Sequence, residues 1–358
     1  MDKINYTLKY LKYKQKYINI KYKNITGGTI NSESINITIY SFNVLNGDTN
    51  TSIMTFKNYN NYNNSIATKI AEIDLIRFHD KRKYYIKELI NIWFNKCSNE
   101  KCIICLQEVN QELLNLLQEF YPKIIFTKDP DIIILSNNKI KEKIEYRVTI
   151  CSPDLEFIDY SDIVLSNGNF IKNALYSLIK LPNGKIIQNI NLHIHYLTDQ
   201  AKMLEFGQII NDKINSEYSF FICGDFNKPL SDIQTFIQKI PIKEIIQPLS
   251  LTNPSFTSID TRAGITTGIK LYPDKNIYLE TIDYFLIGGI DIKYKIKPII
   301  ISNESSFEIF YDLKSIHEIL IPLLNSPKTN IECSDIWSQQ RENKDISDHK
   351  PIMAVIEL

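Results

Sequence analysis

Ser219-Phe-Phe-Ile-Cys-Gly-Asp-Phe-Asn227 decides the fold that we expect for this chain. The run up to Cys223 is apolar and ends at Gly224, which predicts a buried strand followed by a turn. Asp225 and Asn227 then stand just beyond the strand. Aspartate and asparagine are common at strand ends because their side chains hydrogen-bond the turn backbone, so this stretch alone is a weak indication of a functional site.

The same setting recurs along the chain. Five further polar positions lie within strand-like apolar runs or at their ends: Asn43, Gln107-Glu108, His193, Asp283 and Ser347-Asp348-His349. Each has an ordinary structural explanation when taken alone. Six in the same setting indicate instead that these side chains surround one pocket.

Apolar β-branched runs alternate with helical patterns from Ile35 onward. Helices are expected at Lys81–Phe94 and Asn110–Phe120, and strands at Ile35–Val44, Ile103–Leu106, Asp131–Leu135, Leu175–Lys180, Ile186–His195, Ser219–Cys223, Thr281–Ile287, Ile296–Ile301 and Ile352–Leu358. Many strands joined by fewer helices, with a hairpin signal at Leu181-Pro-Asn-Gly184, favour two packed sheets flanked by helices over one doubly wound sheet. No Pro- or Gly-rich linker divides residues 35–358, which we interpret as one α/β domain after a leader of residues 1–34.

The leader is basic and amphipathic. Tyr6, Tyr10, Tyr13 and Tyr17 recur at helical spacing with lysines between them. A surface helix or tether is the favoured interpretation, and binding to an anionic surface or to nucleic acid is the alternative. Residues 1–25 hold seven Lys and one Asp, so the rest of this chain of zero net charge has 34 Lys and Arg against 40 Asp and Glu. Such an acidic body does not by itself indicate a nucleic-acid binder, although a bound divalent ion can supply positive charge locally.

At 358 residues and 44% hydrophobic content, the chain can bury a substantial core. Its six cysteines are too sparse for a disulfide framework and are expected to be reduced core thiols. Cys97, Cys102 and Cys105 could ligate zinc, but no second Cys or His pair stands at a suitable spacing, and a structural role is favoured. No apolar run reaches the roughly 18 residues of a membrane span, and no secretory signal is apparent, so we expect an intracellular protein, cytoplasmic or nuclear.

Six short motifs carry a resemblance to a known family. In order they are Ser41-Phe-Asn-Val-Leu45, Leu106-Gln-Glu-Val109, Asn191-Leu-His-Ile194, Gly224-Asp-Phe-Asn227, Ile282-Asp-Tyr284 and Ser347-Asp-His349. Their order and spacing resemble those of the endonuclease/exonuclease/phosphatase superfamily, which includes pancreatic-type DNase I, and the match spans Ile35–Leu358. The resemblance implies a DNase I-like fold, a four-layer α-β-β-α sandwich with two packed mixed β-sheets.

The resemblance also implies a metal site. Hydrolysis of a phosphate ester needs a hard cation that draws charge from the phosphoryl oxygens, and such a cation prefers oxygen ligands. Glu108 is the implied principal ligand, with Asn43 and Asp348 completing the site and Gln107 nearby. Mg²⁺ is the implied cofactor, with Mn²⁺ as the alternative.

Catalytic roles follow from the same resemblance. Asp225 is implied to accept the proton of the attacking water, and Asn227 to hold that water or a phosphate oxygen. His349 is implied to form a charge-assisted hydrogen bond to the phosphate, with Asp283 fixing its tautomer. His193 is the remaining implied catalytic imidazole.

The histidines differ in how strongly the sequence supports them. His193 lies in a motif that usually reads Thr-His-Leu, and here Leu192 replaces the threonine. His195 is a weaker candidate, two residues further along and on the same face of a regular strand. His79 and His317 have no motif around them and are interpreted as structural.

Three functions remain open at this point. A nuclease or phosphodiesterase acting on DNA or RNA is favoured, because Ser41-Phe-Asn-Val-Leu45 is similar to the deadenylase and phosphodiesterase branches. The first alternative is a phosphatase or phosphodiesterase for inositol phosphates or phospholipid headgroups. Ser347-Asp-His-Lys-Pro351 resembles the inositol-polyphosphate phosphatases, but Lys228-Pro229 follows Asn227 where those enzymes have Asn-Tyr-Arg. The second alternative is a catalytically silent scaffold of the same fold.

The composition also bears on origin. Heavy use of Ile, Asn, Lys and Tyr, together with the Tyr/Lys-rich leader, resembles proteins of large DNA viruses with AT-rich genomes. This resemblance implies a virus-encoded protein. The sequence predicts no oligomeric state.

Overall fold

The computed structural model describes residues 34–44, 83–97, 101–129, 131–134, 140–168, 170–246, 249–250, 258–259, 279–280, 282–300, 326–329, 332, 349 and 351–358. The described helices and strands all lie within Asn36–Leu358. Several predictions fall outside the described residues: the leader before Ser34, the metal ligand Asp348, and the structural His79 and His317.

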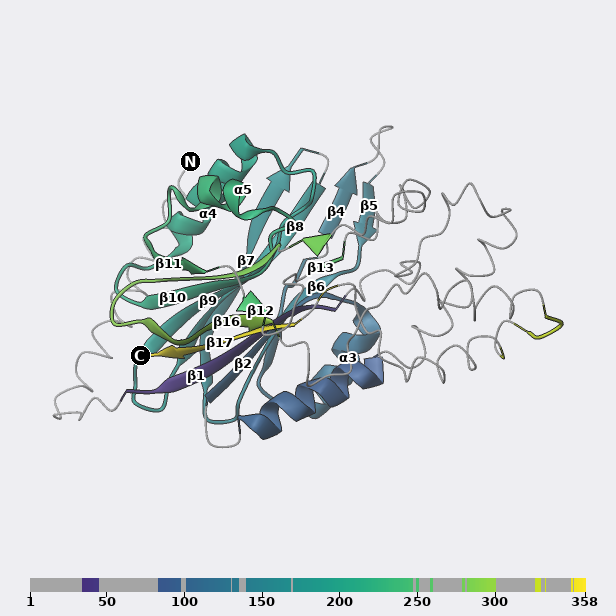
Figure 1. Cartoon of the computed structure of the whole chain (residues 1–358), viewed down its shortest axis with the longest axis horizontal. Helices are drawn as coiled ribbons and strands as arrows, with labels where there is room; N and C mark the ends of the chain where they lie inside the picture. The colour runs from purple at the N-terminus through teal and green to yellow at the C-terminus, as the bar shows by residue number, and fades with distance from the viewer. Residues whose placement is uncertain are drawn as a thin grey trace, which may run out of the picture. The chain divides into compact units, whose positions relative to one another are not determined.

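In the described part of the chain, one sheet has seven strands in the order β12-β16-β17-β1-β2-β6-β3. Their bounds are β1 (Asn36–Asn43), β2 (Lys101–Val109), β3 (Ile124–Phe126), β6 (Tyr146–Cys151), β12 (Leu249–Ser250), β16 (Lys293–Ile300) and β17 (Ile352–Glu357). β1 is parallel to β2 and antiparallel to β17, so the last strand of the chain lies beside the first (Figure 1).

The other large sheet among the described residues has the order β11-β15-β10-β9-β8-β4-β5, with β7 also pairing with β8. Its strands are β4 (Asp131–Ile134), β5 (Ile140–Lys143), β7 (Glu156–Asn167), β8 (Phe170–Lys180), β9 (Ile186–His193), β10 (Ser219–Asp225), β11 (Ile242–Ile246) and β15 (Asp283–Gly288). A small pair is formed by β13 (Ser258–Ile259) and β14 (Leu279–Glu280). The predicted hairpin joins β8 to β9, and Gly184 in its turn has a φ of +82°.

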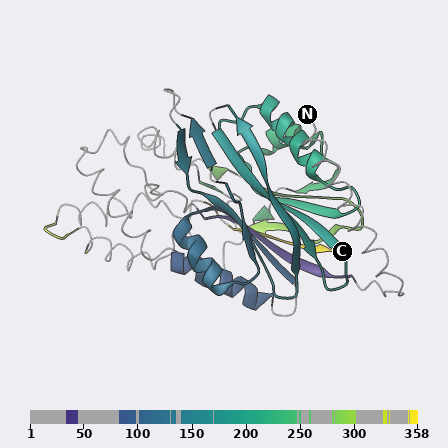
Figure 2. The ribbon, with the colours of Figure 1, turned by 180° about the vertical axis from the view of Figure 1, so that it is seen from behind.

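Helices cover the outer face of each sheet (Figures 1 and 2). The helix of residues 83–96 and α3 (Gln111–Phe120) share one hydrophobic cluster with β1, β2 and β6. α4 (Gln200–Lys213) and α5 (Leu230–Ile237) share the other with β8, β9, β10 and β15. The order of layers is helix, sheet, sheet, helix, which confirms the predicted four-layer α-β-β-α sandwich with two packed mixed sheets.

Alternation along each strand divides its side chains between two environments. In β1, Tyr40 and Phe42 face the helices, where the Tyr40 ring stacks on Trp93 with centroids 4.6 Å apart. Ser41 and Asn43 point the opposite way, toward the other sheet. The apolar face therefore anchors the strand, and the alternate face is available for polar groups.

A hydrogen-bonded polar layer joins the two sheets. Gln107 Nε2 donates to Asn191 Oδ1 at 2.7 Å, and Asn191 Nδ2 donates to the carbonyl oxygens of Leu106 and Val148 at 3.1 and 2.9 Å. Buried amides are costly unless they are hydrogen-bonded, so these bonds favour one register between β2, β6 and β9. The hydrogen-bonded layer lies in the interior, directly behind the polar motif residues at the strand ends.

Several predicted element ends needed correction, two of them close to the motif residues. β9 ends at His193 rather than His195, because the chain turns at residues 196–197, where the Thr198 N–H donates to the His195 carbonyl oxygen at 3.0 Å. The predicted helix from Asn110 begins at Gln111, and Asn110 is its N-cap, a contribution of about 1 kcal/mol.

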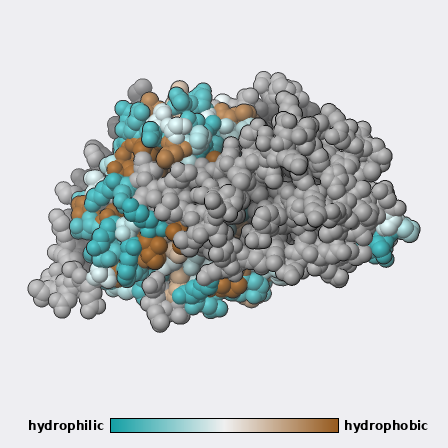
Figure 3. Space-filling view, in the orientation of Figure 1, coloured by the Kyte–Doolittle hydropathy of each residue, from teal (hydrophilic) through white to brown (hydrophobic). Residues whose placement is uncertain are grey.

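The described cysteines are reduced thiols of the interior, as expected. All five are free and buried, and Cys333 lies outside the described residues. On the face shown in Figure 3, hydrophilic and hydrophobic side chains are interspersed over the described residues. Among the described helices, none has the length and apolar character needed to cross a membrane.

Candidate active site

The polar residues singled out in the sequence emerge at one edge of the two sheets. β1 and β2 are parallel, and Asn43 pairs with Gln107 at their carboxyl ends. β9 and β10 are also parallel, with His193 paired to Asp225. β15 is antiparallel to β10 and begins at this edge, where Asp283 faces Asp225. Within each sheet the carboxyl ends of parallel strands share an edge, so the topology brings together the groups that this sheet contributes.

Gly224 lets β10 approach β9 closely where the site begins. Its φ is +139°, and a Cβ at this position would collide with the carbonyl oxygen of Leu192. Only glycine adopts this backbone without strain. Three residues later, at the end of the same motif, Asn227 has a φ of +50°, so the chain turns back toward Asp225.

Glu108 reaches the site through an irregularity in β2. The sequence predicted a strand ending at Leu106, but β2 continues to Val109 with a register shift against β6, and Glu108 has a φ of +55°. Gln107 faces the other sheet, so regular alternation would turn Glu108 toward the helices. The bulge instead directs its carboxylate to Asn43. Backbone strain of this kind is common at functional sites.

Asn43 joins carboxylates of the two sheets. Its Nδ2 donates to Glu108 Oε1 at 3.1 Å and to Asp225 Oδ2 at 2.9 Å. The same nitrogen lies 3.4 Å from His349 Nε2. All four residues are buried. One amide therefore contacts side chains from three other motifs.

Asp225 combines deep burial with two donors from Asn227. The Asn227 N–H donates to Asp225 Oδ1 at 2.7 Å, and Asn227 Nδ2 donates to Oδ2 at 3.1 Å. Burial raises the pKa of Asp225 to about 7, while the His349 imidazole lowers it and the Asp283 carboxylate raises it to smaller extents. A carboxyl group with a pKa near neutrality can accept a proton from water at physiological pH.

The two candidate imidazoles face the same carboxylates. His349 Nδ1 lies 2.9 Å from Asp283 Oδ2, and because a carboxylate only accepts, Nδ1 carries the proton. His349 Nε2 is then directed toward Asp225 Oδ2 at 3.5 Å. His193 Nε2 lies 3.5 Å from Glu108 Oε1 and 3.7 Å from Asp225 Oδ2.

The donor set fits a hard divalent cation. Among the described residues, two groups have ligand atoms within 4.8 Å of one another: Glu108, His193 and Asp225, and Asp225, Asp283 and His349. Buried carboxylates this close repel unless protons or a cation neutralise them, and oxygen donors suit a hard cation. Of the predicted ligands, Asn43 and Glu108 lie here, while Asp348 is outside the described residues.

Neighbouring residues add contacts that the motifs did not indicate. Lys172 Nζ lies 3.5 Å from His193 Nδ1, and a lone lysine within a strand gives no sequence signal of such a contact. Leu192 packs into the helix-facing core, so the residue that replaces threonine points away from His193. Among the described residues, His195 belongs to neither candidate metal-ligand group, and its ring stacks on Phe170 with centroids 3.6 Å apart.

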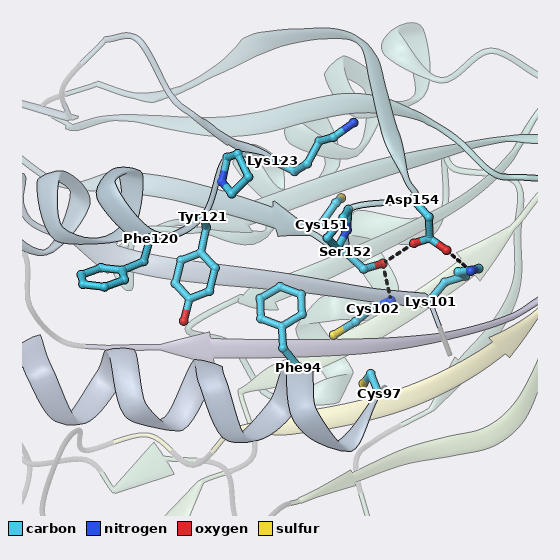
Figure 4. Close-up of a pocket in the computed structure, with 12 residues that line it drawn as sticks. Phe94, Cys97, Lys101, Cys102, Phe120, Tyr121, Lys123, Cys151, Ser152 and Asp154 are labelled. Atoms are coloured by element: carbon cyan, nitrogen blue, oxygen red, sulfur yellow. Dashed lines mark hydrogen bonds and ion pairs between the residues drawn. The ribbon is translucent and has the colours of Figure 1, made fainter. Parts of the chain in front are cut away.

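A separate cavity of about 470 Å³ lies at the other end of β2 and β6 (Figure 4). The rings of Phe94, Phe120 and Tyr121 line it together with Cys102 and Cys151. Burial raises the pKa of both thiols, which keeps them protonated and unreactive. Neither of the two candidate metal-ligand groups of the described residues lies there.

Comparison with known proteins supports the fold. No family model matches the sequence, and no curated protein gives a significant match. An endonuclease/exonuclease/phosphatase from Bacteroides vulgatus is 15% identical with a TM-score of 0.50, over 90% of this chain and 99% of that one. A mannosyl-6-phosphatase from Bacteroides thetaiotaomicron is 12% identical with a TM-score of 0.50, over 89% and 99%. D. rerio TDP2, in complex with a single-strand DNA product, is 10% identical with a TM-score of 0.50, over 90% and 98%.

These likenesses define the class of protein by its fold. The two packed sheets with outer helices are the fold of the endonuclease/exonuclease/phosphatase proteins. The resemblance that the six motifs indicated is therefore confirmed for the fold. The described motif residues meet at one edge of that fold, as the resemblance implied. Their individual catalytic roles stay predictions.

Proposed function

We propose that this chain is a magnesium-dependent phosphoesterase that hydrolyses phosphodiester bonds in DNA or RNA. The observation that carries the proposal is the Asn43 amide, which contacts Glu108, Asp225 and His349 at 2.9 to 3.4 Å. Two carboxyl groups, one from each sheet, and an imidazole thus face one buried point. Such a point suits a reaction that needs a cation, an activated water and a stabilised oxyanion.

In this proposal Glu108 and Asn43 hold the cation, whose chemistry is to draw charge from the phosphoryl oxygens. Asp225 accepts the proton that the attacking water loses as its oxygen bonds to phosphorus and the bond between phosphorus and the leaving oxygen breaks, and the leaving oxygen takes a proton from solvent. Asn227 keeps both Asp225 oxygens in place. His349, held by Asp283, donates a hydrogen bond to a phosphoryl oxygen as charge develops there.

An aromatic ladder beside the catalytic edge supports a nucleic-acid substrate. The Phe170 and His195 rings stack at 3.6 Å with an interplanar angle of 16°, and Tyr196 lies 4.6 Å from His195 at 34°. Tyr196 is 44% exposed, and His195 is two residues from His193. Lys228 Nζ donates to the Tyr196 carbonyl oxygen at 2.9 Å, which holds this segment in place. Exposed aromatic rings next to a phosphate site are suited to stacking unpaired bases.

Replacing Tyr196 by alanine is expected to raise the KM for a single-stranded oligonucleotide by about 5- to 100-fold, because one stacked base contributes roughly 1–3 kcal/mol. Steady-state kinetics on a fluorescent oligonucleotide measure this. Hydrolysis of bis(para-nitrophenyl) phosphate should be unchanged, since that substrate has no flanking base. Tyr84→Ala removes an exposed tyrosine from the helix of residues 83–96 and is the matched control. An unchanged KM in Tyr196→Ala would remove the ladder from substrate binding.

A substrate panel tests the proposed substrate class against its alternatives. Single-stranded DNA, single-stranded RNA, duplex DNA, inositol phosphates and a sugar phosphate are compared at equal Mg²⁺. We expect turnover of a single-stranded nucleic acid to exceed that of the small phosphates. Preference for an inositol phosphate would favour the phosphatase alternative instead. No turnover of any substrate, by a folded protein that binds no metal, would favour the silent scaffold.

A further inference from the structure

Four charged side chains form a buried network next to His193. Arg147 Nη2 donates to both oxygens of Asp131 at 2.6 and 2.8 Å. Lys172 Nζ contacts Asp131 Oδ2 at 2.9 Å and Glu145 Oε2 at 3.0 Å. Each of the four side chains is at most 8% exposed. The two positive and two negative charges balance, which removes much of the cost of burying them.

The network holds the Lys172 ammonium in one place because the members of the network come from both sheets. Arg147 lies on β6 of the seven-stranded sheet, whereas Asp131 and Lys172 lie on β4 and β8 of the other. Asp131 also accepts from the backbone N–H of Asn173 at 3.1 Å, which fixes it against β8. The ammonium group therefore has little freedom to move away from His193.

Lys172 has three N–H donors and three acceptors within reach. Two are the carboxylates of Asp131 and Glu145, and the third is His193 Nδ1 at 3.5 Å. An ammonium group cannot accept a hydrogen bond, so His193 Nδ1 must present its lone pair to Lys172. A neutral imidazole with a lone pair on Nδ1 carries its proton on Nε2.

We propose that Lys172 is a positioning residue that fixes His193 as the Nε2–H tautomer, with this N–H aimed at the oxygens of the catalytic centre. The effect of this tautomer on catalysis rests on the proposed function, whereas the tautomer itself does not. His193 Nε2 lies 3.5 Å from Glu108 Oε1 and 3.7 Å from Asp225 Oδ2, so acceptors stand where the Nε2–H points. This donor serves to hold a phosphoryl oxygen or the attacking water.

The other imidazole of the site is oriented by a carboxylate. His349 Nδ1 faces the Asp283 carboxylate and carries a proton, and His349 Nε2 lies 3.4 Å from Asn43 Nδ2. The Lys172 ammonium thus orients the His193 imidazole, and the Asp283 carboxylate orients that of His349.

The variant that tests this must keep the buried charges balanced. Lys172→Met alone leaves Asp131 and Glu145 opposite Arg147 only, and an uncompensated buried charge is destabilising. Lys172→Met with Glu145→Gln removes one charge of each sign and leaves the Arg147–Asp131 pair. Lys180→Met, on the same strand but with a side chain 36% exposed, is the control for loss of a lysine.

The tautomer can be read directly by ¹⁵N NMR of histidine-labelled full-length protein, with the His193 signal assigned from a His193→Gln variant. We expect Nε2–H in the wild type and in Lys180→Met, and a mixture of tautomers in the Lys172→Met/Glu145→Gln variant. An Nδ1–H tautomer in the wild type, or an unchanged tautomer in the double variant, would overturn the proposal. The NMR measurement requires no enzymatic activity, so its result does not depend on whether the proposed function is correct.

Kinetics distinguish positioning from a structural role. The double variant is expected to lose about 10- to 100-fold in kcat with little change in KM, as when groups that orient a catalytic side chain are removed. In a His193→Ala background the same two changes should cause no further loss of kcat, because Lys172 then has no imidazole to orient. An equal loss in both backgrounds would mean that the network acts on the fold and not on His193.

Discussion

Replacing Glu108 by glutamine is expected to reduce Mg²⁺-dependent hydrolysis of bis(para-nitrophenyl) phosphate by at least about 10³-fold, or about 4 kcal/mol of transition-state stabilisation. Glutamine keeps the shape of the side chain but removes its charge and one acceptor oxygen. The bulge that aims residue 108 at Asn43 is a backbone feature, so the variant should retain the fold. Initial rates at saturating Mg²⁺ measure the effect.

Glu119→Gln is the matched control, because Glu119 is an exposed residue of α3, away from the carboxylate edge. It should hydrolyse the diester at the wild-type rate. Circular dichroism and thermal melting of both variants show whether they are folded. Undiminished hydrolysis by Glu108→Gln would remove Glu108 from the metal site and with it the central assignment of the six motifs.

Replacing Asp225 by asparagine is expected to lower kcat by about 10²- to 10⁴-fold, because the proton acceptor for the attacking water is lost. The same change should alter how stability depends on pH. The asparagine side chain cannot ionise, whereas burial raises the pKa of Asp225 to about 7 in the folded protein, above the ordinary aspartate value of 3.8. Urea unfolding in EDTA, from about pH 4 to pH 8, measures the difference.

The sign of the pH effect follows from proton binding. Between about pH 4 and pH 7 the folded state binds the Asp225 proton and the unfolded state does not, so wild-type stability falls as pH rises through this window. The full loss is on the order of 4 kcal/mol, present above about pH 7. The asparagine variant lacks this component. Its absolute stability also changes, because an amide nitrogen cannot accept from Asn43 or Asn227, so the pH slope is the decisive readout.

Identical pH slopes in the wild type and the variant would show that Asp225 has an ordinary pKa and would remove the physical basis for its role as a base. A variant that keeps wild-type kcat would exclude that role directly. Mg²⁺ added back to the wild type should reduce the pH slope, since a cation beside Asp225 favours its ionised form.

The convergence of the site could be anticipated from the sequence because it depends on topology. Asn43, His193 and Asp225 follow apolar strand runs, and the carboxyl ends of parallel strands meet at one edge. Apolar runs are readable in a single sequence, and so is the order of the motifs. The four-layer fold follows from the same pattern.

Other features could not be read because they depend on contacts across the fold. The turn of Glu108 into the site comes from a bulge against β6, and Lys172 meets His193 only because β8 and β9 are neighbours. β7 and α4 were not expected from the sequence, although Met203, Phe206 and Ile210 of α4 form a buried helical face. Asp348 keeps its predicted role as a metal ligand without a structural test.

The most direct measurement for the central claim is the position of Mn²⁺ in crystals of the active protein, located by its anomalous scattering. We expect a peak bonded to the Glu108 carboxylate and beside Asn43, together with loss of both the peak and the activity in Glu108→Gln. A protein that hydrolyses phosphodiesters with its metal bound away from Glu108, or with no metal at all, would contradict it.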